Sequence, residues 1–62
     1  MNKSQKNNYN FIVSEGIRFA KDADFDKAEK NFLKAIDIDK DEYEAYINLS
    51  NIYMGRKMEK WQ

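Results

Sequence analysis

The chain is 62 residues long, with eleven Lys and Arg against eleven Asp and Glu, and it contains no His, Cys or Pro. This length allows one small domain, and the lack of Cys excludes disulfide and thiolate–metal chemistry. The lack of His removes the common general base and transition-metal ligand at neutral pH, and the zero net charge argues against binding to nucleic acid or to anionic membranes.

The first eight residues, 1–8, are polar, and we expect a frayed lead-in there. No apolar signal-type core follows this polar start. No apolar run approaches the roughly 20 residues that a membrane span needs. These features predict a cytoplasmic protein that does not bind membranes.

From Tyr9 onward the apolar residues recur at helical spacing, which predicts a first helix up to about residue 21. Its stripe comprises Ile12, Gly16, Phe19, Ala20 and Ala23, with Val13 and Ile17 beside it. Asp24 is placed to cap a second helix over residues 25–38 through its carboxylate. The inner side of this second helix comprises Phe25, Ala28, Phe32, Ala35 and Ile36, and its lysines face water.

Asp41 and, three residues on, Glu44 resemble a capping box with Asp41 as the cap, which predicts a third helix that begins after Asp41 and continues through Met54. Residues 55–57 are compatible with a turn into a fourth helix. They are equally compatible with a third helix that runs on, because Met54, Met58 and Trp61 share one helical face. No strand-like alternation occurs along the chain, so the predicted fold class is all-α, an antiparallel helical hairpin plus a third helix.

The sequence repeats when it is shifted by 34 residues. Tyr9 then aligns with Tyr43, and Val13 aligns with Ile47. Small residues align with each other at Gly16 and Ser50, and aromatic residues align at Phe19 and Tyr53. Because the positions that must pack are the ones that match, the chain has an internal repeat.

The residues at these positions resemble a tetratricopeptide repeat (TPR), a 34-residue helix–turn–helix unit. The motif positions of the two units are Ile12, Glu15-Gly16, Phe19, Ala28, Phe32 and Ala35, followed by Tyr46, Leu49-Ser50 and Tyr53. Two positions depart from the family pattern: Glu15 stands where the family prefers Leu, and Lys40 stands where it prefers Pro. The resemblance implies one complete unit over residues 9–42 and the first helix of an incomplete unit over residues 43–62, a fragment of a right-handed α-solenoid.

The same resemblance implies a concave face that binds a protein or peptide, without a cofactor. By matching positions, this face comprises Asn10, Val13, Ser14, Ile17, Lys21, Glu44, Ile47, Asn48, Asn51 and Met54. An alternative hypothesis is a structural protein that forms a dimer, with or without exchange of helices, because the third helix carries too many large apolar groups to bury against a single hairpin. The candidates for self-association are Tyr46, Ile52, Tyr53, Met58 and Trp61.

Three weaker signals are interpreted as local structure. The acidic triplets over residues 22–26 and 37–41 resemble the start of a calcium loop but lack its Gly and its final Glu, which favours helix capping and turns. Glu15 is a carboxylate on an apolar face, but the chain offers no nucleophile–base pair, so we expect no catalysis. A basic cluster beside Trp61 is interpreted as cations that stabilise the negative C-terminal end of a helix dipole rather than as a nucleic-acid site; it comprises Arg56, Lys57 and Lys60.

Overall fold

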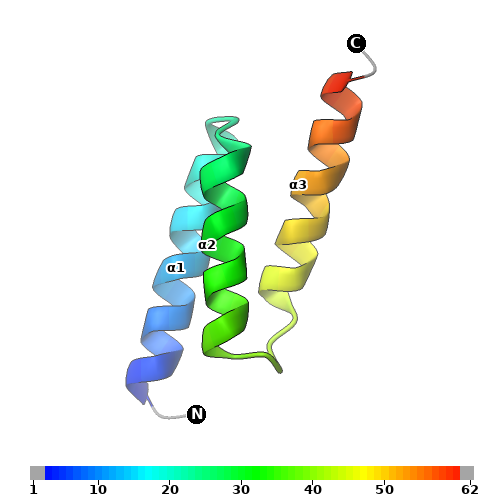
Figure 1. Cartoon of the computed structure of the whole chain (residues 1–62). Helices are drawn as coiled ribbons and strands as arrows, with labels where there is room; N and C mark the ends of the chain where they lie inside the picture. Colours follow the sequence, from blue (N-terminus) through cyan, green and yellow to red (C-terminus); the bar gives the residue numbers. More distant parts are fainter. Residues whose placement is uncertain (1–2, 61–62) are drawn as a thin grey trace.

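The computed structural model describes the backbone of residues 3–60 and the side chains of residues 7–55. Its elements are the helices α1 (Lys3–Lys21), α2 (Phe25–Ile38) and α3 (Glu44–Lys60), and these described residues include no strand. α1 and α2 lie side by side as an antiparallel hairpin, and α3 starts beside the end of α2 and leans away from it toward its own C-terminal end (Figure 1). The predicted all-α fold, a helical hairpin plus a third helix, is confirmed.

α1 begins at Lys3, six residues before the predicted start at Tyr9. Residues 3–8 contain neither Gly nor Pro, so nothing in this segment breaks a helix that is already nucleated by packing further along. The polar segment 1–8 is therefore helical from Lys3 on. Within the described side chains, the buried face of α1 starts at Tyr9, as the periodicity predicted.

The α1–α2 turn ends α1 with a left-handed residue. Ala23 has φ 62°, and two backbone bonds close the turn: Asp24 N–H to the Phe19 carbonyl at 2.8 Å and Ala23 N–H to the Ala20 carbonyl at 3.0 Å. This is the Schellman arrangement, which usually places Gly at the left-handed position. The assignment of Ala23 to the apolar stripe of α1 is therefore wrong: the residue is exposed in the turn, because the helix has already ended.

α2 begins and packs as predicted. The carboxylate of Asp24 accepts a hydrogen bond from Lys27 N–H at 3.5 Å, which caps the helix. On the inner side of α2, Phe32 is buried against α1, where its ring lies directly over Gly16. Asn31, at the edge of this contact, donates from Nδ2 to the Ile12 carbonyl at 3.3 Å, which joins the two helices of the hairpin.

α3 begins at Glu44, so the cap position is Tyr43 and the predicted cap at Asp41 is wrong. The chain must first turn out of α2, and Asp41 takes part in that turn by donating its N–H to Asp39 Oδ1 at 3.1 Å. α3 then runs through Gly55 to Lys60 without a turn. Of the two possibilities for residues 55–57, the structure has the longer third helix.

The core joins all three helices. Its buried residues are Tyr9, Val13, Ala28, Phe32, Ala35, Ala45 and Ile52, and partly buried Ile17, Phe19, Phe25 and Leu49 pack around them. α2 lies between α1 and α3 and makes most of the contacts of both. Across the described residues, none of the helices combines the length and the apolar character needed to cross a bilayer.

Candidate functional site

A cleft of about 210 Å³ opens where the three helices meet. The hairpin provides Ile17, Ala20, Lys21, Phe25 and Phe32, and α3 provides Asn48, Asn51 and Ile52. α3 leans away from the hairpin toward its C-terminal end (Figure 1). Phe25 lines the cleft, and its ring lies next to Gly55 of α3. The result is a cleft that is apolar at its base.

The rim of the cleft is polar. Asn48 donates from Nδ2 to the Glu44 carbonyl at 2.9 Å, which holds its amide in place on α3. Asn51, one turn further along, and Lys21, at the end of α1, are exposed. Amide groups both donate and accept hydrogen bonds, whereas the ammonium group only donates. The rim can therefore bind a peptide backbone beside an apolar side chain, with a preference for negative charge near Lys21.

Four of the ten predicted concave-face residues line this cleft: Ile17, Lys21, Asn48 and Asn51. Asn10, Ser14 and Glu44 are exposed but do not line it. The placement of Val13 on a binding surface is wrong, because this residue is 3% exposed. Val13 follows Tyr9 by four residues, so both side chains lie on the face of α1 that the other helices cover.

Ile47 and Met54 belong to a different surface, the outward stripe of α3. Its members are all exposed and recur with the helical pattern i, i+3, i+4, i+7, i+10 and i+11, beginning at the cap residue of α3: Tyr43, Tyr46, Ile47, Ser50, Tyr53 and Met54. The buried side chains of α3, Ala45 and Ile52, lie on the opposite face of the same helix, since Ile47 follows Ala45 by about 200° of rotation. α3 therefore has two apolar faces.

Of the predicted self-association residues, Tyr46 and Tyr53 are on the outward stripe. The prediction for Ile52 is wrong, because this side chain is 2% exposed and faces the core seven residues after Ala45. Met58 and Trp61 lie outside the described side chains, as do Arg56, Lys57 and Lys60.

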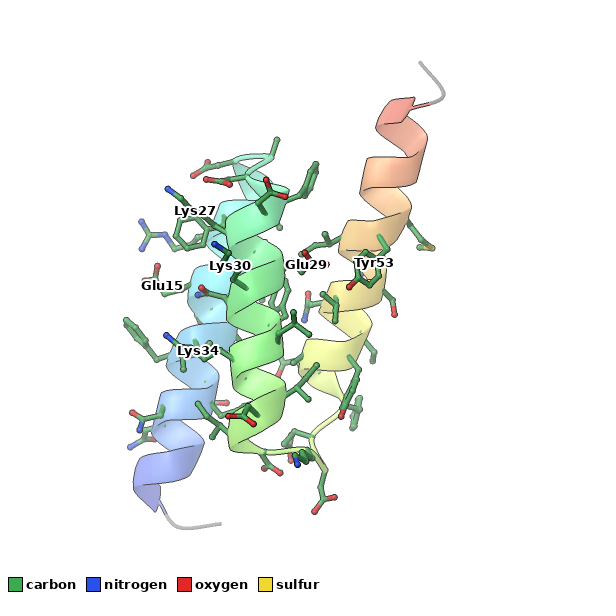
Figure 2. The ribbon with its side chains drawn as sticks, viewed as in Figure 1. Glu15, Lys27, Glu29, Lys30, Lys34 and Tyr53 are labelled. Carbon is green, nitrogen blue, oxygen red and sulfur yellow. The ribbon has the colours of Figure 1, made fainter. Side chains whose placement is uncertain are left out.

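The charged residues occupy the helix surface and the turns. Lys27, Lys30 and Lys34 lie along one side of α2, and Glu29 lies on the side toward α3 (Figure 2). The Lys27 ammonium is 3.6 Å from the Asp24 carboxylate and also lies over the Phe19 ring, 5.7 Å from its centre. This row of lysines is thus a solvated helix face, as its spacing predicted.

Glu15 forms an ion pair of 3.3 Å with Arg18, one turn away on α1, and its side chain is 30% exposed. The acidic triplets act in capping and turns through Asp24 and Asp39. Within residues 7–55, no group of three or more carboxylates is placed to hold a metal ion.

Tyr9 joins α1 to α3, a role that the sequence did not indicate. Its buried hydroxyl oxygen accepts a hydrogen bond of 3.1 Å from Ala45 N–H, in the first turn of α3. Burial raises the pKa of this hydroxyl above its ordinary value of 10.0, the hydrogen bond from Ala45 lowers it, and the nearby carboxylates of Glu44, Glu42 and Asp39 raise it. The net effect is a raised pKa, so Tyr9 is a neutral structural group at physiological pH.

The base of the cleft was also missed as a binding surface. Phe25, Phe32 and Ile52 carry the ordinary signal of core residues. Phe32 and Ile52 are buried, and Phe25 is the one of these three that stays partly exposed in the cleft. Comparison of the chain with protein-family models, with curated proteins and with solved structures found no match.

Proposed function

We propose that this chain is a non-catalytic interaction module that binds a peptide or a helix of another protein in the cleft between α1 and α3. The observation that carries the proposal is the composition of the cleft, in which the partly exposed apolar residues Ile17, Ala20 and Phe25 lie beside the amides of Asn48 and Asn51. Such an apolar base with a few polar groups above it is the usual form of a recognition site.

The size of the cleft favours a protein ligand over a free small molecule. Its volume of about 210 Å³ is below the roughly 300–1,000 Å³ of typical small-molecule sites. A space of this size takes one or two apolar side chains, and the rest of the ligand then lies across the surface. The ligand that fits best is a segment with a Leu-sized anchor and an acidic residue within reach of Lys21.

The TPR resemblance supports the same proposal. The 34-residue repeat relates α1 to α3, and in the family the first helix of each unit lines the binding face. The close contact of Phe32 with Gly16 is the packing that the small and aromatic motif positions call for. We therefore propose a TPR-like unit that acts in the cytoplasm as a scaffold, without a cofactor.

A peptide library displayed on phage, selected against the immobilised chain, tests this function. We expect peptides with an apolar anchor beside Asp or Glu, and we expect them to shift the amide NMR signals of Ile17, Asn48 and Asn51. The variants Ile17→Asp and Asn51→Asp should lose binding because each places a negative charge in the cleft. Phe11→Asp changes an exposed apolar side chain outside the cleft and should bind as the parent chain does. Selected peptides that bind both cleft variants unchanged would show that the cleft is the wrong site.

A second candidate function is a structural protein that associates with itself. The outward stripe of α3 favours it, because Tyr43, Ile47 and Met54 are each more than half exposed. Contiguous exposed apolar side chains of this kind typically mark an interaction surface. The two candidates use different sides of α3, so they can be tested separately.

A further inference from the structure

We infer that the outward stripe of α3 is the interface of a symmetric dimer, in which it packs antiparallel against the same stripe of a second copy of this chain. The inference rests on the second candidate function and specifies its contact surface. Of the seven large apolar side chains that are exposed among the described residues, five lie on this stripe: Tyr43, Tyr46, Ile47, Tyr53 and Met54.

The internal repeat relates the residues of the stripe to residues of α1 that are buried. Tyr9 and Val13 of α1 are 2% and 3% exposed, and their repeat counterparts Tyr43 and Ile47 are 72% and 52% exposed. Gly16 is buried beneath Phe32, and its counterpart Ser50 is exposed. α1 and α3 thus present corresponding faces, and the face that α1 buries against the rest of the chain is uncovered on α3.

The chemistry of the stripe favours a second copy as the occupant. None of its six residues is charged, and the chain has a net charge of zero, so two copies approach without net repulsion. A two-fold symmetric interface requires a surface that is complementary to itself. An antiparallel pairing centred on Ser50 meets this requirement, because it places Tyr46 opposite Met54 and Ile47 opposite Tyr53. The small side chain at the centre lets the two helices approach closely.

The available area is sufficient for a weak dimer. The exposed fractions of the five large side chains lie between 44% and 72%, which leaves about 100 Å² on each and about 500 Å² per copy. Two copies together bury about 1,000 Å², which is the lower end for a specific interface. We therefore expect a dimer that dissociates at micromolar concentration rather than an obligate one.

Sedimentation velocity over a range of about 10 to 500 µM, which spans the dissociation constants expected for an interface of this size, tests the dimer. The mass should rise from 7.4 kDa toward twice that value. Ile47→Lys adds a charge to the stripe without disturbing the core, and it should raise the dissociation constant at least about tenfold. Phe11→Lys, at a position on α1 that is 65% exposed against 52% for Ile47, should leave the constant unchanged. A parent chain that stays monomeric at the highest concentration would overturn the inference, and the stripe would then be left to a different protein.

The geometry has its own test, because the chain contains no Cys. Ser50→Cys should form a disulfide-linked dimer on mild oxidation, since the antiparallel pairing brings the two positions together at the symmetry axis. Ser14→Cys, also exposed but on α1, is the matched control and should form no disulfide cross-link. Equal cross-linking of the two variants would reject the proposed pairing.

The proposed dimer and the proposed peptide binding can be contradicted separately. Asn51→Asp should lose selected peptides and keep the mass of the dimer, because Asn51 lines the cleft and not the stripe. Ile47→Lys should keep the peptides and lose the dimer. A dimer that persists in Ile47→Lys would place the interface elsewhere and overturn the inference, whatever the result of the peptide selection.

Discussion

The hydroxyl oxygen of Tyr9, on α1, accepts a hydrogen bond of 3.1 Å from the backbone N–H of Ala45, which lies 36 residues later in the first turn of α3. The first N–H groups of a helix have no partner within the helix. A side chain from a distant helix here satisfies one of them, a task that usually falls to the residue just before the helix. Because α2 otherwise separates α1 from α3, this bond fixes the start of α3 on the hairpin.

Removal of the Tyr9 hydroxyl should destabilise the fold. Tyr9→Phe keeps the ring in the core but leaves Ala45 N–H buried without this acceptor, so we expect a loss of about 1–3 kcal/mol in the free energy of unfolding. Urea unfolding followed by circular dichroism measures the change. The repeat counterpart provides the control: Tyr43→Phe alters a side chain that is 72% exposed and should change stability by less than about 0.5 kcal/mol. Equal effects of the two substitutions would contradict the role assigned to the bond.

Stability should also fall at alkaline pH because of Tyr9. Its pKa in the folded chain is raised above the ordinary 10.0, so the unfolded chain loses the hydroxyl proton first as the pH increases. The contribution of Tyr9 is thus fully present below pH 10 and is lost as the pH rises through the folded pKa. Unfolding measured between about pH 8 and 11 should show this decline in the parent chain and a shallower one in Tyr9→Phe. Parallel pH profiles for the two proteins would contradict the prediction.

The two glycines should respond in opposite directions to the same substitution. A Cβ atom at Gly16 would lie 2.6 Å from Cε1 of Phe32, whereas at Gly55 the nearest atom, in the Phe25 ring, is 3.7 Å away. Because the Phe32 ring is itself buried, Gly16→Ala forces it to shift, and we expect a loss of about 1–3 kcal/mol. Gly55→Ala meets only ordinary contacts inside a helix and should gain about 0.5–1 kcal/mol. Thermal unfolding of both variants, beside the parent chain, gives the comparison.

A glycine introduced at position 23, at the end of α1, should increase the stability of the fold. Ala23 adopts a left-handed conformation, with φ 62°, that costs a residue with a Cβ atom roughly 1–2 kcal/mol. Ala23→Gly removes this cost, partly offset by the greater freedom of Gly in the unfolded chain, and should stabilise the fold by about 1 kcal/mol. Ala23→Val should destabilise it, since a β-branched residue tolerates this conformation poorly. The midpoint of thermal unfolding should therefore increase in the order Val, Ala, Gly, and any other order would count against the turn geometry.

The sequence by itself determined the elements that depend on neighbours along the chain. Asp24 and the apolar spacing from Phe25 to Ala35 define α2 from end to end, because a cap and a 3.6-residue period act within a few turns. The internal repeat likewise identified Gly16 as a position that must pack, and the structure places the Phe32 ring over it. The early start of α1 at Lys3 and the late start of α3 at Glu44 were missed. Helix ends fray, and small differences in turn formation and packing shift them by a few residues.

Only the tertiary structure decided which apolar residues are inside. Val13 and Ile52 are buried while their neighbours in the predicted surfaces, Ile17 and Tyr53, are not fully covered. Each of these residues lies on an apolar helix face, and its exposure depends on which other helix covers that face. The position of α3 opens the cleft above Phe25 and leaves the outward stripe exposed, and the Tyr9 hydroxyl helps to hold α3 there. Periodicity shows that a face is apolar, but the covering of that face is a long-range property of the packed chain.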